Sequence, residues 1–173
     1  MNKKLRKRLF LILIGVIIIA SAIVLVIIYH NHRSNYPISI SIQKQLNFIP
    51  FITVPTSFDP VSQPYNINYD KPDQLLVYKL NFEGQSLVVS QQATPQSFND
   101  IPDVYNQLII KMRGGTTFST PAGTVNITYP KEYNGLQTAV MDSDGVLMFT
   151  RPTKNLSTGQ WQRLFNQFIT LHE

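Results

Sequence analysis

One uninterrupted apolar run, residues 9–28, constrains this chain more than any other feature of its sequence. The run holds twenty residues without a charge or a proline, and eleven of them are isoleucine or valine. As a helix it would measure about 30 Å, which is the thickness of the hydrocarbon core of a bilayer. In lipid, a helix is the way for a single segment to satisfy its own backbone hydrogen bonds, so the poor helix propensity of these residues matters little. The sequence therefore predicts a transmembrane helix over residues 9–28.

The charges that flank this run predict its orientation. Residues 1–8 contain five lysines and arginines and no acid, whereas Arg33 is the only cation between the run and Lys44. Basic residues collect on the cytoplasmic side of a membrane segment. We therefore expect a single-pass protein of the cell membrane that contacts the lipid bilayer through residues 9–28. Its N-terminus is predicted to be cytoplasmic and its C-terminal domain extracytoplasmic.

A cleaved signal peptide is the alternative interpretation of the same run. Ala20-Ser21-Ala22 matches the small-x-small pattern of a cleavage site. The apolar run continues for six residues past this point, to Ile28, whereas the apolar region of a signal peptide usually has about 7–15 residues and ends before the cut. This favours an uncleaved signal-anchor. The mass of the mature protein distinguishes the two interpretations.

The net charge of +5 belongs to this topology signal rather than to a nucleic-acid surface. From Ser34 onward the chain has nine basic and ten acidic residues, without a basic cluster. Cysteine is absent from the sequence, which excludes disulfides, thiol nucleophiles and thiolate metal sites. A domain of this kind must be held together by its hydrophobic core alone.

Four segments are expected along the chain: a cytoplasmic basic stub (1–8), the transmembrane helix (9–28), a polar linker (29–37) and one extracytoplasmic α+β domain (38–173). Within the domain, period-2 patterns and turn residues predict strands. Residues 38–43 fit a strand or a short helix, the two prolines in 48–55 allow only an extended edge-like segment, and 93–98 reads as a loop. The predicted strands are 65–69, 75–82, 86–91, 116–120, 124–129, 137–141 and 146–151. Two pairs of them are predicted hairpins: 75–82 with 86–91, and 137–141 with 146–151.

Two helices are predicted in the domain, and both are expected to pack on the sheet. The first follows Asp100 or Asp103 as its N-cap, runs to about Met112 and ends at a Gly114-Gly115 cap. Val104, Leu108 and Met112 recur at four-residue spacing and give it an apolar face. The second begins at Ser157, which forms a capping box with Gln160. Its apolar stripe at helical spacing is Trp161, Leu164, Phe165 and Phe168. The expected fold is thus an N-terminal transmembrane helix followed by a curved antiparallel sheet of about six or seven strands carrying two helices.

No catalytic, cofactor-binding or metal-ligating residue is predicted. His30 and His32 lie in the linker and His172 in the C-terminal tail, which leaves no serine–histidine–aspartate triad inside the domain. Asp142 and Asp144 have the spacing of a calcium loop, but the glycine follows too early and no bidentate glutamate is present. The sequence does not exclude a catalytic serine–lysine pair, because serines are numerous. The domain also offers four candidate lysines: Lys79, Lys111, Lys131 and Lys154.

Several segments of the domain resemble a known group of proteins. They are Pro50 to Pro55, the hairpin end Val88-Val89-Ser90-Gln91-Gln92, and Thr120-Pro121-Ala122-Gly123-Thr124-Val125, followed by Ala139-Val140, Leu147-Met148-Phe149 and the serine-capped last helix. Together they are similar to small extracytoplasmic domains of unknown function on bacterial single-pass membrane proteins, including the C-terminal domains of some anti-sigma and sporulation-linked proteins. The resemblance implies a curved antiparallel sheet with helices on one face, distantly like periplasmic lipoprotein-binding half-barrels. It assigns no catalytic residue.

The predicted function is therefore a membrane-anchored, non-enzymatic binding or interaction domain of the bacterial cell envelope, without a cofactor and without a nucleic-acid partner. Its partner is expected to be an envelope protein or peptide. A structural subunit of a secretion-type or pilus-type assembly is one alternative. A membrane-tethered serine–lysine hydrolase is the other.

Overall fold

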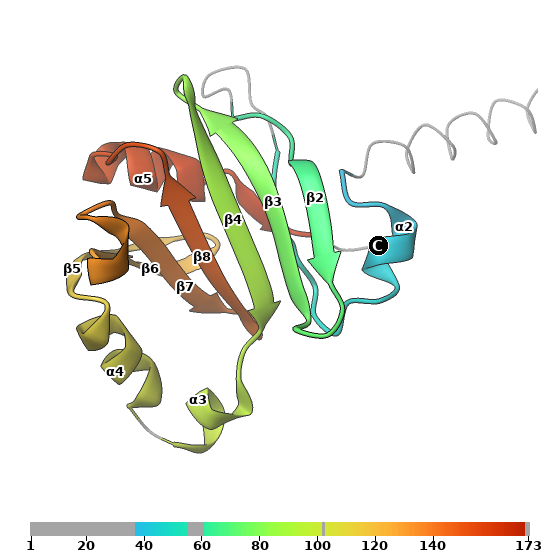
Figure 1. Ribbon diagram of the computed structural model, residues 1–173, viewed down its shortest axis with the longest axis horizontal. Coiled ribbons are helices and arrows are strands. Elements are labelled where there is room, and N and C mark those ends of the chain that lie inside the picture. Colours follow the sequence, from blue (N-terminus) through green and yellow to red (C-terminus); the bar gives the residue numbers. More distant parts are fainter. Residues whose placement is uncertain (1–36, 55–60, 102, 172–173) are drawn as a thin grey trace, which may run out of the picture. The chain divides into compact units, whose positions relative to one another are not determined.

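The computed structural model of the chain describes residues 37–54, 61–101 and 103–171 (Figure 1). The predicted basic stub, the transmembrane helix and all of the linker except Pro37 lie outside the described residues. Within the described ranges, no helix has the combination of length and apolarity needed to cross a membrane. The unit that begins at Ile38 is described below by itself.

Seven antiparallel strands form the main sheet in the order β2-β3-β4-β8-β7-β6-β5. A second, two-stranded sheet pairs β1 with β9. The predicted antiparallel sheet is confirmed, and it is open, with β2 and β5 at its two edges. The strands are β1 (Phe51–Thr53), β2 (Tyr65–Asp70), β3 (Leu75–Phe82), β4 (Gln85–Ala93), β5 (Gly114–Thr120), β6 (Gly123–Thr128), β7 (Thr138–Ser143), β8 (Val146–Pro152) and β9 (Phe168–Thr170).

Two tight turns fix the register of the central hairpins. Glu83 and Gly84 both have positive φ, 49° and 76°, between β3 and β4. Asp144 and Gly145, with φ of 51° and 73°, have the same arrangement between β7 and β8. Two central residues with positive φ match the right-handed twist of the flanking strands. Both hairpins predicted from the sequence are confirmed.

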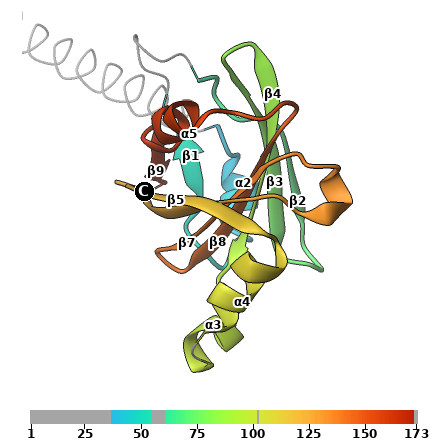
Figure 2. The ribbon, with the colours of Figure 1, turned by 90° about the vertical axis from the view of Figure 1, so that its left-hand side faces the viewer.

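The core lies on one face of the main sheet, called here the inner face. On β3 its members alternate along the strand: Leu76, Tyr78, Leu80 and Phe82 are all buried. Helix α5 (Thr158–Phe165) covers this face and buries Trp161, Leu164 and Phe165. Figure 2 shows α5, β1 and β9 together on this one side of the sheet. Apolar side chains from the sheet, from α5 and from the small sheet form one continuous cluster.

A buried polar network fastens the small sheet to the main one. The side-chain amide of Gln91 on β4 accepts a hydrogen bond from the backbone N–H of Phe51 and donates one to the Phe51 carbonyl, both at 2.8 Å. The Tyr78 hydroxyl donates to the same carbonyl at 2.8 Å. Burial raises the pKa of the Tyr78 phenol, so it is a neutral donor. Gln91 thus supplies β1 with the hydrogen bonds that a neighbouring strand would provide.

The last helix differs from its prediction at its C-terminal end. Ser157 caps α5 in a capping box with Gln160, as predicted. The helix ends at Phe165, however, and Phe168 belongs to β9, where it pairs with Thr53 of β1. Phe168 is still buried, because a strand residue can point to the same core that a helical stripe would reach.

The predicted helix before β5 is present as α4 (Val104–Lys111) with Asp103 at its N-cap position, as predicted, but its packing, the role of the Asp103 side chain and its C-terminal end differ from expectation. It buries none of its residues, so one of the two helices expected to pack on the sheet does not do so. Asp103 occupies the N-cap position in a left-handed conformation, and its carboxylate accepts hydrogen bonds from the side chains of Asn106 and Gln107 instead of capping the backbone. Arg113 takes the left-handed position after α4, and Gly114 already begins β5.

Two shorter helices complete the described elements. For residues 38–43 the sequence was compatible with either a strand or a short helix. The structure has a short helix there, α2 (Ile40–Gln43), capped by the Ser39 side chain. The predicted loop 93–98 is wrong in its second half, because α3 (Gln96–Asp100) begins there. A single 3-10 turn, η1 (Lys131–Tyr133), lies between β6 and β7.

Glu83 at the tip of the β3–β4 hairpin anchors α5 electrostatically. Its carboxylate accepts a hydrogen bond from Gln160 and pairs with the guanidinium of Arg163. These contacts, the Gln160 hydrogen bond first, lower the pKa of Glu83 below its ordinary value of 4.5. The pair is partly exposed, with 31% of the Glu83 and 45% of the Arg163 side chain accessible. Its contribution to stability is therefore small.

We expect Glu83→Gln to lower the free energy of unfolding at neutral pH by less than about 1 kcal/mol. Because the folded-state pKa is lowered, this stabilisation is full above the pKa of the unfolded chain and is lost as the pH falls through the folded-state value. Urea titrations of the wild type and the variant should therefore converge as the pH is lowered from 4.5 through the lower folded-state pKa of Glu83. A difference that persists unchanged into acid would contradict the ionic origin of the contact.

Candidate functional site

The residues considered for chemistry on sequence grounds do not come together in the described structure. The three histidines lie outside the described residues. Asp144 sits exposed in the β7–β8 turn, while Asp142 accepts a hydrogen bond from the Thr94 hydroxyl. Within residues 37–54, 61–101 and 103–171, no three histidine, cysteine or acidic side chains lie grouped as a metal site. The four candidate lysines are all exposed, whereas a lysine base needs a desolvated setting: Lys79, Lys111, Lys131 and Lys154.

Among the described residues, the inner face of the sheet, where a half-barrel protein would hold a hydrophobic ligand, is covered by the protein's own side chains. Trp161, Leu164 and Phe165 of α5 are fully buried against it, and so are the central side chains of β3 and β4. Since the face is filled by the protein's own side chains, a binding surface has to be sought on the exterior.

Helices α3 and α4, called here the arm, are among the least buried elements of the described fold. Neither helix has a buried residue. Ile110 is 65% exposed and Ile101 54%, the two highest values among the large hydrophobic side chains of the described residues. Val104 and Leu108, which the sequence placed on the apolar face, are only half-buried. An amphipathic helix whose apolar face is only half-buried among the described residues indicates a surface for a partner.

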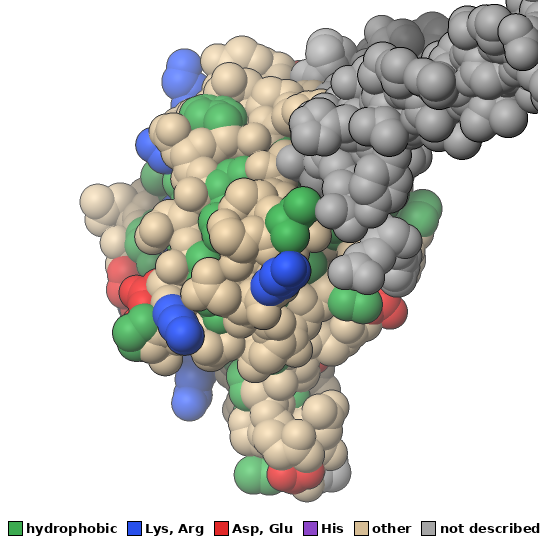
Figure 3. Space-filling model, turned by 90° about the vertical axis from the view of Figure 1, so that its right-hand side faces the viewer, with side chains coloured by type: hydrophobic (Ala, Val, Ile, Leu, Met, Phe, Trp, Pro, Cys, Tyr) green, Lys and Arg blue, Asp and Glu red, His purple; other side chains and the backbone are tan. Residues whose placement is uncertain are grey.

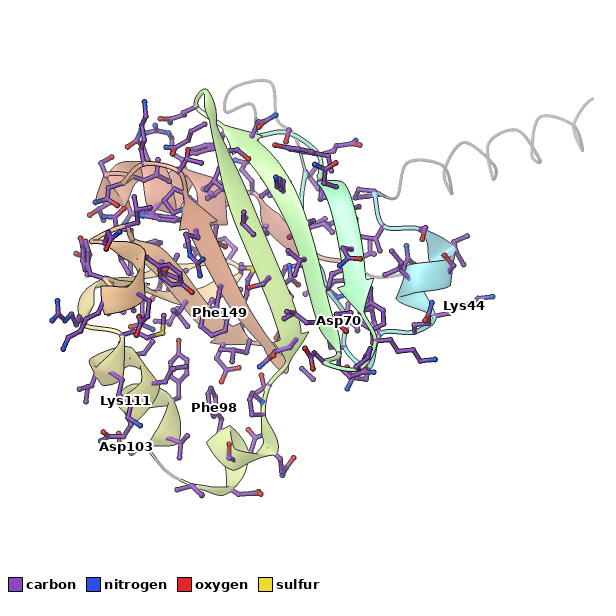
Figure 4. All side chains as sticks on the ribbon, in the orientation of Figure 1. Lys44, Asp70, Phe98, Asp103, Lys111 and Phe149 are labelled. Atoms are coloured by element: carbon purple, nitrogen blue, oxygen red, sulfur yellow. The ribbon has the colours of Figure 1, made fainter. Side chains whose placement is uncertain are left out.

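The arm is nevertheless held in place by specific contacts. The rings of Phe98 on α3 and Tyr105 on α4 lie 5.7 Å apart, centre to centre. In Figure 4, Phe98 lies on the side of α3 that faces α4. The Tyr105 hydroxyl accepts a hydrogen bond from the Asn126 amide on β6 at 3.0 Å, and Asn126 accepts one from Thr117 on β5 at 2.9 Å. This chain of contacts ties the arm to the two last strands of the sheet.

Burial and the nearby carboxylate of Asp142 raise the pKa of Tyr105, and burial is the larger cause. The hydrogen bond from Asn126 acts in the opposite direction. The phenol therefore stays neutral at physiological pH, and the link between the arm and β6 does not change its charge there.

The C-terminal end of α4 lies directly against the start of β5. A Cβ atom built on Gly114 would lie 2.5 Å from the Ile109 side chain, so glycine is required for this close approach. The backbone N–H of Tyr129, just after β6, donates to the Met112 carbonyl at 2.9 Å. The arm and the β5 edge are thus adjacent surfaces of one region, as Figure 2 shows.

Strand β5 is an exposed edge that has a register irregularity at its start but lacks the charges and prolines that also protect edge strands. Among the described residues it pairs with β6 alone, and five of its seven residues are exposed. Its sequence, GGTTFST, contains no charge and no proline. Native edge strands are normally protected by charges, prolines or bulges, because their unpaired N–H and C=O groups attract another strand. A register shift between Gly114 and Thr117 leaves Thr117–Thr120 as the regular part.

The opposite edge of the sheet, β2, is protected. Asn66 has a positive φ of 51° and lies within a register irregularity between Tyr65 and Asn68. The strand ends in the charged Asp70, and the Tyr69 hydroxyl donates a hydrogen bond to the Gln45 carbonyl after α2. Figure 3 views this side of the molecule and shows hydrophobic side chains scattered among polar ones. The contrast with β5 identifies the β5 edge as the candidate site.

We call this candidate site the β5–arm surface, and it consists of the free edge of β5 together with the exposed faces of α3 and α4. The sequence predicted the strand and the helix but not the surface. The signal that it did contain is the absence of charge and proline in residues 114–120, which has a meaning only once β5 is known to be an edge. Comparison of the chain with protein-family models, with curated proteins and with solved structures found no match.

Proposed function

We propose that this chain is a single-pass membrane-anchored protein whose domain acts outside the cytoplasm as a non-enzymatic binding domain of the cell envelope. The apolar run 9–28 and the five cations before it support the anchor and its orientation. The observation that carries the binding role is the β5–arm surface, where an uncharged edge strand lies beside helices with exposed isoleucines. Such an edge accepts an extended segment through main-chain hydrogen bonds.

The topology is testable because the chain contains no cysteine of its own. We expect a cysteine introduced at Ser119 to react with a membrane-impermeant maleimide in intact cells from which any outer barrier has been removed. A cysteine introduced at Asn2, in the basic stub, should react only after the membrane is permeabilised. Labelling of Asn2→Cys in intact cells, or recovery of the chain in the soluble fraction, would contradict the proposed anchor.

The binding role is tested by a photo-reactive residue at Ile110, with the same residue at Lys79 as its matched control. Both side chains are exposed, but Lys79 lies on β3, away from the β5–arm surface. We expect cross-linked products of defined mass at position 110 in intact cells and none at position 79. Equal cross-linking at the two positions would indicate random encounters and would contradict a specific surface.

A further inference from the structure

We propose that the partner of the β5 edge is the β5 edge of a second copy of this chain, so that two main sheets join antiparallel across a two-fold axis. This inference rests on the proposed binding role of the β5–arm surface and names its occupant. The first argument is the composition of the strand. Because β5 carries no charge, two copies meet without the like-charge repulsion that keeps most edge strands apart.

The second argument is the position of Phe118 at the end of an inner-face row. Across the sheet this row runs through five paired residues: Gln91, Met148, Met141, Val125 and Phe118. Phe118 contacts Phe165 of α5, with ring centres 6.4 Å apart, and is 8% exposed at the edge. A two-fold axis at Phe118 places this ring beside its symmetry mate on the same face. The hydrophobic cores of the two copies then become continuous.

This register also brings only small, uncharged side chains opposite one another on either side of Phe118. With the axis at Phe118, Thr117 of one copy faces Ser119 of the other, and Thr116 faces Thr120. Directly opposed residues of an antiparallel pair point to the same face, so small hydroxyl side chains meet one another in both pairs, and the Thr117–Ser119 pair lies on the outer face. The pairing uses the regular segment Thr117–Thr120 and leaves most of the bulged start of the strand outside it.

The third argument is the charge at the two ends of β5. Lys111 and Arg113 are exposed at its N-terminal end. Its C-terminal end, Thr120, is uncharged, and no charged residue follows it in the sequence before Lys131. Antiparallel pairing therefore places the basic end of each copy at the uncharged end of the other and keeps the two basic ends apart.

The test compares Ser119→Lys with Thr124→Lys in the full chain, purified in detergent. The two residues are direct partners across β5 and β6, and both are exposed, so the variants differ only in whether the added charge lies on the edge strand or one strand inward. We expect the wild type and Thr124→Lys to sediment as dimers and Ser119→Lys to dissociate about tenfold more readily. A wild type that sediments as a monomer, or equal weakening by both substitutions, would overturn the proposal.

Single cysteines locate the contact independently of any loss of stability. With a short bis-maleimide, Ser119→Cys should form a cross-linked dimer in native membranes, whereas Asn68→Cys on the β2 edge should not. Cross-linking through Asn68 instead of Ser119 would overturn the β5 assignment. If Ser119→Cys cross-links the chain to a different protein and not to itself, the second copy is excluded while the proposed binding role stands.

Discussion

Trp161→Ala is expected to lower the free energy of unfolding by about 3–5 kcal/mol, the largest effect of any single substitution considered for this domain. The side chain has no exposed surface and packs against the Phe165 ring at 6.1 Å between centres. Its indole N–H donates to the side-chain Oε1 of Gln137 at 2.9 Å, and that oxygen also accepts from the backbone N–H of Leu156. Truncation leaves a cavity where α5 meets the sheet and removes one of these hydrogen bonds.

Urea titration of the full chain in a mild detergent, followed by far-ultraviolet circular dichroism, measures this loss. Gln162→Ala, on the exposed side of the same helix, is the matched control and should change the free energy of unfolding by less than about 0.5 kcal/mol. If both substitutions had the same small effect, α5 would not be an integral part of the core.

Gln91→Leu is expected to destabilise the domain by about 3 kcal/mol although leucine is apolar and similar in size. The substitution leaves the backbone N–H of Phe51 buried without its acceptor and removes the donor to the Phe51 carbonyl. A buried polar group that loses its partner costs about 1–3 kcal/mol, and here the loss also frees one edge of β1. We expect the amide hydrogen of Phe51 to exchange much faster in the variant than in the wild type.

Gln92→Leu is the control for this experiment, because Gln92 is the next residue on β4 and points to the opposite, half-exposed face. It should leave both the stability and the Phe51 exchange rate nearly unchanged. Equal effects at positions 91 and 92 would show that the buried amide does not hold the small sheet.

Local sequence signals were sufficient for the hairpins and for the start of α5. Positive φ at Glu83-Gly84 and Asp144-Gly145 follows from residues that tolerate this conformation, and alternation on either side of each turn sets the strands. The capping box of Ser157 and Gln160 likewise acts within three residues. These predictions hold because each depends on neighbours in the chain.

The same local reasoning did not predict the role of Gly114-Gly115, the strand that contains Phe168 or the exposure of the apolar face of α4. The glycines serve the close approach of Ile109 and Tyr129 rather than a helix cap. Phe168 leaves the helical stripe because β9 pairs with β1, a strand far away in the sequence. The apolar pattern of α4 is real, but no period in a sequence shows whether the domain will cover that face.

The sequence by itself thus determined the strands of the main sheet, the main turns, the buried residues of α5 and the uncharged composition of residues 114–120. Tertiary structure alone decided that β5 is an edge, that the arm stays unburied beside it, and that Gln91 pairs with the backbone of Phe51. The physical reason is the distance along the chain over which each kind of interaction acts. Backbone conformation and side-chain periodicity act over a few residues, whereas an edge, an uncovered face or a buried amide partner depends on which distant segments pack together.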